Sequence, residues 1–200
     1  MKIATHNSAT CNKGKGLLSW FATPFARCQS KSIKGQYDAG CRWFDIRVKQ
    51  DTKYDGQFYV CHGVWRTSTL MEVLKECFNA VTLGEHVMLD ITWEGDVSDW
   101  TEAKKKAFVN SMHAAVDTTN SLFNEEGYEY LKPLWLMSVQ GKSPFGTFFW
   151  TSENRPALVK GFQGLYWFTW RLLLPIPWLW RKIYGQPTFN DEYYTQVDFL

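Results

Sequence analysis

Stretches of strand length alternate with stretches of helical periodicity along much of this chain. Two strand patterns end at residues 6 and 62, and others cover residues 41–48, 86–93 and 134–139. A weaker strand pattern covers residues 147–150, and the last covers residues 193–200. The helical patterns cover residues 30–40, 69–78 and 98–120. Strand, helix and strand in succession favour parallel pairing with right-handed crossovers. The order of elements therefore predicts an α/β fold built on a parallel sheet.

Local signals mark the ends and the outer faces of the predicted helices. Gly40 is a good C-cap residue for the first helix. Thr69 and Glu72 have the spacing of a capping box at the start of the second. The lysine run at 104–106 interrupts the apolar periodicity of the third, so it predicts a solvated helix face rather than a binding patch.

Four polar residues form the candidate site. Asp45 and Arg47 stand two residues apart in the strand pattern at 41–48, so both must point to the same face of a sheet. His6 and His62 each end another strand pattern. A histidine base, a histidine acid and a fixed guanidinium are the groups that cleavage of a phosphodiester requires.

Composition bounds the class of protein without choosing it. The 200 residues fit one domain, with 45% hydrophobic and 21% charged residues and a net charge of +2. These values argue against disorder and against a strongly basic nucleic-acid surface. Aromatic residues reach 17%, including 11 tryptophans.

The cysteines and the two remaining histidines show no sign of a metal or redox site. The five cysteines, an odd number without a Cys-x-x-Cys pair or zinc-type spacing, are Cys11, Cys28, Cys41, Cys61 and Cys77. We expect reduced, mostly buried thiols. His86 and His113 are interpreted as structural or surface residues.

The sequence segments around the candidate residues resemble those of a known family. In chain order the segments are THNSAT at 5–10, CQSKSIKGQYDAGCRWFDIRV at 28–48, YVCHG at 59–63, TLMEVL at 69–74, GEHVMLDI at 84–91 and VDFL at 197–200. This series resembles the X-domain of phosphatidylinositol-specific phospholipase C, bacterial branch. The match is dense over about the first 95 residues and returns only at the C-terminal VDFL.

The resemblance implies a closed (β/α)8 TIM-type barrel that fills residues 1–200 as a single catalytic domain. Such barrels usually need about 250 residues. At this length the barrel is expected to be compact or distorted, with reduced helices in its second half.

The resemblance also implies a role for each residue. His6 would be the base that activates the inositol 2-hydroxyl, and His62 the acid that protonates the diacylglycerol oxygen. Arg47 would stabilise the charge on the phosphoryl oxygens. Asp198, on the last strand, would hold His6 in its working tautomer. The expected products are diacylglycerol and inositol 1,2-cyclic phosphate.

One departure from the family bears on metal dependence. Bacterial relatives usually carry aspartate directly after the first histidine, where this chain has Asn7, as the calcium-dependent animal enzymes do. Those enzymes, however, place a carboxylate where this chain has Arg47, which would repel calcium. We therefore expect a metal-independent site without a cofactor, with Asn7, Asp45 and Glu94 as the alternative calcium ligands.

A second departure concerns substrate binding. Only the strand with Asp90, Thr92 and Glu94 can be carried over from the inositol-binding strands of the family. These residues share one face by alternation, and relatives place a lysine or glutamate at the position of Thr92. Substrate contact and a polar barrel interior or structural ion pair both remain open for them.

A phosphatidylinositol substrate requires docking on a membrane. Residues 165–180 are too broken by Arg171, Pro175 and Pro177 to span a bilayer, and their composition suits the headgroup layer. The alternative is that the aromatics fill or cap the barrel. The candidate interface residues are Trp20, Trp167, Trp170, Trp178 and Trp180. The expected partner is a phospholipid surface, without nucleic acid or an obligate protein partner.

Two other functions and the cellular location remain open at this stage. A catalytically weak lipid-binding module would keep the barrel and lose turnover. A glycerophosphodiesterase would need paired carboxylates for a metal, and the sequence Asp45-Ile46-Arg47 breaks that pair. If Met1 is the native start, the chain leaves no room for a secretory signal, which predicts a cytoplasmic or peripheral membrane protein. A non-native Met1 would leave secretion open.

Overall fold

The computed structural model describes residues 2–5, 8–12, 14, 29, 31–50, 56–63, 65–123, 132–139, 188–190 and 194–197. Its first elements are β1 (Lys2–Thr5), the 3-10 helix η1 (Ser8–Cys11), α2 (Ile33–Asp38), β2 (Cys41–Gln50), β3 (Phe58–His62) and β4 (Trp65–Thr69). The later elements are α3 (Leu70–Ala80), β5 (Val87–Trp93), α4 (Glu102–Phe123), β6 (Leu134–Val139), β7 (Thr188–Asn190) and β8 (Tyr194–Val197). The strand expected at 147–150 lies outside the described residues.

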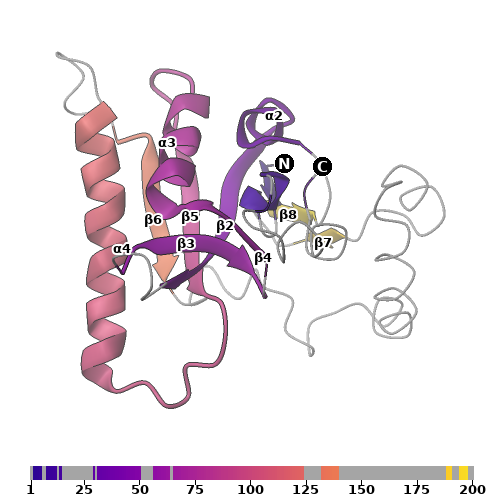
Figure 1. The fold of residues 1–200 in the computed structure, drawn as a ribbon. Coiled ribbons are helices and arrows are strands. Elements are labelled where there is room, and N and C mark those ends of the chain that lie inside the picture. Colours follow the sequence, from indigo (N-terminus) through magenta and orange to yellow (C-terminus); the bar gives the residue numbers. More distant parts are fainter. Residues whose placement is uncertain are drawn as a thin grey trace, which may run out of the picture.

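Five strands form a parallel sheet in the order β8-β1-β2-β5-β6. The predicted α/β class is thus confirmed, and β8 lies beside β1 as the last strand of a barrel would (Figure 1). β7 adds to the outer edge of β8 in the antiparallel direction. Closure into a full barrel stays a prediction.

β2 is paired along both of its edges, and one edge is shared by two strands. β5 pairs with residues 43–48 of β2, whereas β1 pairs with residues 41–44 and β3 with residues 48–50. Val48 is aligned with both Trp93 of β5 and Val60 of β3, so β3 must lie on the edge opposite β5. The same reasoning places β1 on that edge. The C-terminal ends of β1 and β3 therefore converge on the middle of β2.

The expected parallel pairing is wrong for β3 and β4, which form an antiparallel hairpin that joins β2 (Figure 1). Only residues 51–57 connect β2 to β3, and a parallel crossover needs about a dozen residues or more. β4 was not expected at all. It runs directly into α3, because Thr69 both ends β4 and caps the helix.

The predicted helix starts are confirmed for α3 and shifted for α2 and α4. At α3 the Thr69 hydroxyl accepts from the Glu72 amide at 3.2 Å, and the Glu72 carboxylate accepts from the Thr69 amide at 2.8 Å. The N-cap of α2 is Ser32. α4 begins at Glu102 instead of residue 98, because the Asp96 carboxylate accepts from the amide of Ser98 and holds a turn there. The lysine run of α4 is exposed, as predicted.

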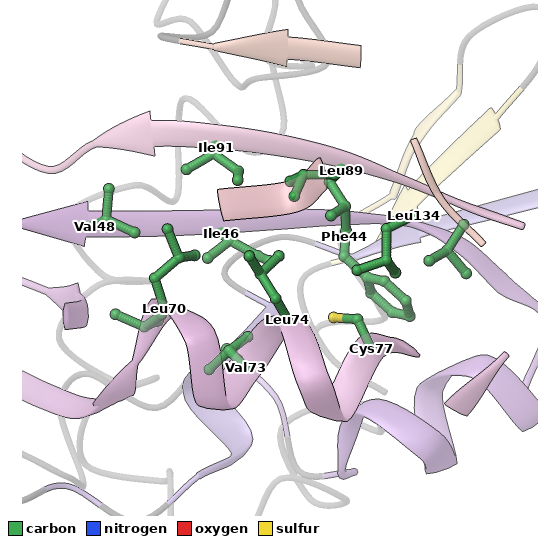
Figure 2. Packing of buried hydrophobic residues seen from close by; sticks show 14 of the residues in the cluster. Phe44, Ile46, Val48, Leu70, Val73, Leu74, Cys77, Leu89, Ile91 and Leu134 are labelled. Carbon is green, nitrogen blue, oxygen red and sulfur yellow. The ribbon is translucent and has the colours of Figure 1, made fainter. Parts of the chain in front are cut away.

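The two faces of the central strands differ in chemistry. On one face, Phe44, Ile46 and Val48 of β2 pack with Leu89 and Ile91 of β5 against α3 (Figure 2). Alternation turns Asp45 and Arg47 to the opposite face, away from α3. Within the described residues, no helix is both long and apolar enough to cross a bilayer. The helix-covered face thus holds the core, and the opposite face carries the polar residues of the candidate site.

The packing of α3 predicts a difference between two neighbouring side chains. Leu74 is fully buried, whereas Met71 is 38% exposed. Leu74→Ala should lower the free energy of unfolding by about 2–5 kcal/mol because it leaves a cavity, and Met71→Ala, the matched control, by much less. Urea denaturation followed by circular dichroism measures both. Equal losses in the two variants would contradict this assignment of the buried face.

Candidate active site

Arg47 lies between two carboxylates on the face of the sheet opposite α3. Its Nε is 3.6 Å from Oδ2 of Asp45, and its Nη1 donates to Oε2 of Glu94 at 3.2 Å. The Asp45 side chain is only 3% exposed, whereas that of Arg47 is 25% exposed. The predicted shared face of Asp45 and Arg47 is confirmed. The guanidinium is held by fixed acceptors while part of it still reaches solvent.

Glu94 connects β2, β5 and the turn after β3. It directly follows β5, and its amide donates to the Val48 carbonyl at 2.9 Å, so its backbone continues the ladder with β2. Its Oε1 accepts from the Gly63 amide at 2.8 Å while Oε2 accepts from Arg47. Gly63 has a φ of 60°, a left-handed conformation that favours glycine. One carboxylate thus joins Arg47 to the turn that follows His62.

His62 is half-buried at the end of β3, opposite Trp65 of β4. The residue before it, Cys61, is buried, and the residue after it is Gly63, which donates to Glu94. The backbone that follows β3 therefore hydrogen-bonds to Glu94, which also contacts Arg47.

His6, Asn7 and Asp198 lie outside the described residues, but the strands that lead to them are described. β1 and β8 are parallel, with Thr5 aligned with Val197. In sequence, Thr5 precedes His6 and Val197 precedes Asp198. On its other edge β1 aligns Thr5 with Phe44, the residue before Asp45.

Buried hydrogen bonds hold the segments on both sides of residues 6 and 7. The Ser8 hydroxyl donates to the Thr5 carbonyl at 2.9 Å, and Nε2 of Gln36 donates to the Ser8 carbonyl at 2.8 Å. Both Ser8 and Gln36 are fully buried. We did not predict either contact from the sequence. The sequence shows only a polar residue, Gln36, within the helical pattern at 30–40. The pattern does not indicate which group this residue hydrogen-bonds.

The remaining polar residues of this face, Asp90 and Thr92, lie on β5 beside Asp45 and Arg47. Asp90 is aligned with Asp45, and its Oδ2 accepts from Nε1 of the buried Trp43 at 2.7 Å. Thr92 is aligned with Arg47, and its buried hydroxyl has no hydrogen-bond partner among the described residues. Asp90 therefore supports the apolar floor formed by Trp43 and Met88, whereas Glu94 reaches Arg47.

The described cysteines are free thiols, as expected. Burial raises the pKa of Cys41 and of Cys61 to about 12, and burial also raises the pKa of Cys77. Thiols with such values are protonated at neutral pH and make poor nucleophiles. Cys61 therefore does not compete with the histidines as a catalytic group, although Glu94 and Arg47 both act on its pKa. Cys28 lies outside the described residues.

The other two histidines lie away from Arg47. His86 stacks on Trp135 with ring centroids 3.7 Å apart, and His113 is exposed on α4. These positions agree with their interpretation as structural and surface residues.

Two of the three alternative calcium ligands lie within the described residues. Asp45 and Glu94 both contact Arg47, and Asn7 lies outside the described residues. In the part of the chain that the structure describes, no group of three or more histidine, cysteine, aspartate or glutamate residues is arranged to hold a metal ion. The candidate interface tryptophans, residues 20, 167, 170, 178 and 180, also lie outside the described part.

No sequence family matches the chain, and no curated protein matches it. Solved structures do. One of phosphatidylinositol-specific phospholipase C from Staphylococcus aureus has a TM-score of 0.51 at 19% identity over 77% of this chain and 55% of that one. A variant of the same enzyme gives 0.50 at 19% identity, with the same coverage of 77% and 55%. The enzyme from Listeria monocytogenes gives 0.46 at 19% identity over 70% of this chain and 51% of that one.

The similarity to the S. aureus enzyme shows the fold. The chain spans about half the length of these bacterial phospholipases. The described part of the chain is thus similar in fold to part of the S. aureus phospholipase C.

Proposed function

We propose that the protein is a phosphodiesterase that cleaves phosphatidylinositol, or a glycosylated relative, to diacylglycerol and inositol 1,2-cyclic phosphate. The observation that carries the proposal is the convergence of the ends of β1 and β3 on β2, beside Arg47. The similarity to bacterial phospholipases C supports the fold on which it rests.

The proposed reaction uses the two histidines in opposite protonation states. His6 takes the proton of the inositol 2-hydroxyl, whose oxygen attacks phosphorus, and His62 protonates the diacylglycerol oxygen as its bond to phosphorus breaks. Asp198 accepts from the other ring nitrogen of His6 and fixes its tautomer. The alignment of Thr5 with Val197 supports this pairing, because in sequence His6 and Asp198 directly follow the ends of these two parallel strands.

Arg47 stabilises the charge that develops on the phosphoryl oxygens. Its contacts with Asp45 and Glu94 orient the guanidinium before substrate arrives, which reduces the reorganisation needed during the reaction. Asp45 is thus a positioning residue for Arg47. Thr92 is aligned with Arg47, so its side chain lies on the same face of the sheet as the guanidinium.

Substitution of the proposed acid and base tests this mechanism. His6→Ala and His62→Ala should each lower kcat on phosphatidylinositol by roughly 100-fold to 10,000-fold, because each removes a proton transfer from the transition state. The Arg47→Lys variant should also lose most of its activity, since an ammonium group cannot reproduce the planar set of hydrogen-bond donors of a guanidinium. Release of diacylglycerol from mixed micelles measures the rates.

His113→Ala is the matched control, because this histidine is exposed on α4, and it should keep the native rate. Melting curves of all variants separate loss of catalysis from loss of folding. A His62→Ala protein with near-native activity would contradict the assignment.

The reaction is proposed to need no metal ion. Calcium at the alternative ligands would have to displace Arg47 from both Asp45 and Glu94. Activity should therefore survive excess EDTA and follow a bell-shaped pH profile set by the two histidines, with Asn7→Asp neutral or beneficial. Loss of activity on chelation and its recovery with calcium would instead support Asn7, Asp45 and Glu94 as ligands.

Docking on the membrane is assigned to the tryptophan-rich segment from the sequence alone. Trp178→Ala together with Trp180→Ala should weaken sedimentation with anionic vesicles and lower activity on bilayers, while turnover of a soluble inositol phosphodiester stays unchanged. If these side chains instead pack inside the protein, the melting temperature falls and both substrates are affected alike. Unchanged vesicle affinity would rule out the docking role.

The ion pairs of Arg47 also favour a second candidate, a lipid-binding module without turnover. In that case Arg47 would only neutralise Asp45 and Glu94. Vesicle binding without release of diacylglycerol would identify it. A glycerophosphodiesterase is disfavoured, because it needs paired carboxylates for a metal, whereas Asp45 and Glu94 both contact Arg47.

A further inference from the structure

We propose that Glu94 is a positioning residue that sets the distance between Arg47 and the turn of His62. The inference rests on the proposed function and deepens it. It goes beyond the roles that the sequence suggested for Glu94, which are substrate contact, metal binding and a structural ion pair.

The two oxygens of the Glu94 carboxylate serve two different elements. Oε2 accepts from Nη1 of Arg47 on β2 at 3.2 Å, and Oε1 accepts from the amide of Gly63, after β3, at 2.8 Å. The Glu94 side chain is 14% exposed, and its bond to Arg47 is partly buried, whereas its bond to the exposed Gly63 lies at the surface. Hydrogen bonds that involve a charged group are shorter and stronger than neutral ones.

The backbone of Glu94 is itself fixed. Its amide donates to the Val48 carbonyl at 2.9 Å, next to the parallel pairing of Val48 with Trp93. The carboxylate therefore projects from a continued sheet ladder. A site supported by a strand holds its groups more precisely than a mobile loop does.

The two bonds meet a requirement of the chemistry. His62 must reach the leaving oxygen while Arg47 contacts other oxygens of the same phosphate, so the separation of the two groups must match one substrate. β3 pairs with β2 only at residues 48–50, beyond Arg47, and the hairpin turn at Gly63 continues past that pairing. The hydrogen bond from the Gly63 amide to Glu94 holds the end of β3 near Arg47. Misplacement of a catalytic group by about 1 Å can cost about a hundredfold in rate.

The test compares Glu94→Ala, Glu94→Gln and a matched control on two substrates. Phosphatidylinositol has a poor leaving group that requires an acid, whereas inositol nitrophenyl phosphate releases nitrophenolate without one. Glu94→Ala should lower kcat by about a hundredfold on phosphatidylinositol and by clearly less on the nitrophenyl substrate.

Glu94→Gln should recover most of the difference between the two substrates, because its amide oxygen can still accept from the Gly63 amide. Its remaining loss, from the missing charge beside Arg47, should be equal on both. Glu102→Gln is the control. It removes a carboxylate that also pairs with a cation, Lys105, but lies exposed on α4, so it should leave both rates unchanged.

Amide hydrogen exchange at Gly63 gives a readout that does not depend on turnover. The Gly63 amide should exchange faster in Glu94→Ala than in the wild type and in Glu94→Gln, by about tenfold or more. Native rates in Glu94→Ala, or equal losses on both substrates, would overturn the role of Glu94 alone. A wild-type protein that cleaves neither substrate would overturn the proposed function, and the catalytic role of Glu94 with it.

Discussion

The pairing of β2 determines where every other part of the candidate site lies. This strand is hydrogen-bonded to β5 along one edge and to both β1 and β3 along the other. Because two strands share an edge, their ends must approach each other at the middle of β2. Asp45 and Arg47 occupy that stretch and face away from the helix-covered core. A strand that only joined two neighbours would not bring three chain segments to one guanidinium.

The charges around Arg47 are more easily explained by function than by stability. Burial of a carboxylate such as Asp45 costs several kcal/mol in lost hydration, and an ion pair commonly does no more than offset that cost. Apolar side chains would fill the same space at least as well. The bidentate use of Glu94, with one oxygen on Arg47 and one on Gly63, instead fixes geometry. Fixed geometry is what a general acid and an electrostatic stabiliser acting on one phosphate require.

Local signals in the sequence predicted the local structure well. The capping box of Thr69 and Glu72 and the shared face of Asp45 and Arg47 follow from spacing alone, because each depends on residues two or three positions apart. The hairpin of β3 and β4 was missed, because a strand that ends at His62 has the same pattern whether the chain turns back or continues. The start of α4 was missed because the Asp96 turn interrupts a sequence of helical periodicity.

Contacts between distant residues could not be predicted in the same way. Glu94 meets Gly63 from 31 positions away and Arg47 from 47 positions away, and Gln36 meets Ser8 from 28 positions away. Each contact depends on the register of the sheet or the packing of a helix, which the pattern of one segment does not contain. The face of Glu94 was correctly inferred, but the turn that it supports was not.

The central claim is that this fold brings a base, an acid and Arg47 to one phosphodiester with a neighbouring hydroxyl. Phosphorus NMR of phosphatidylinositol incubated with the protein tests it most directly. The account predicts a five-membered cyclic inositol phosphate that forms as the lipid signal declines, since the attacking oxygen belongs to the inositol ring. An unchanged lipid signal, or an acyclic phosphate formed without the cyclic species, would contradict it.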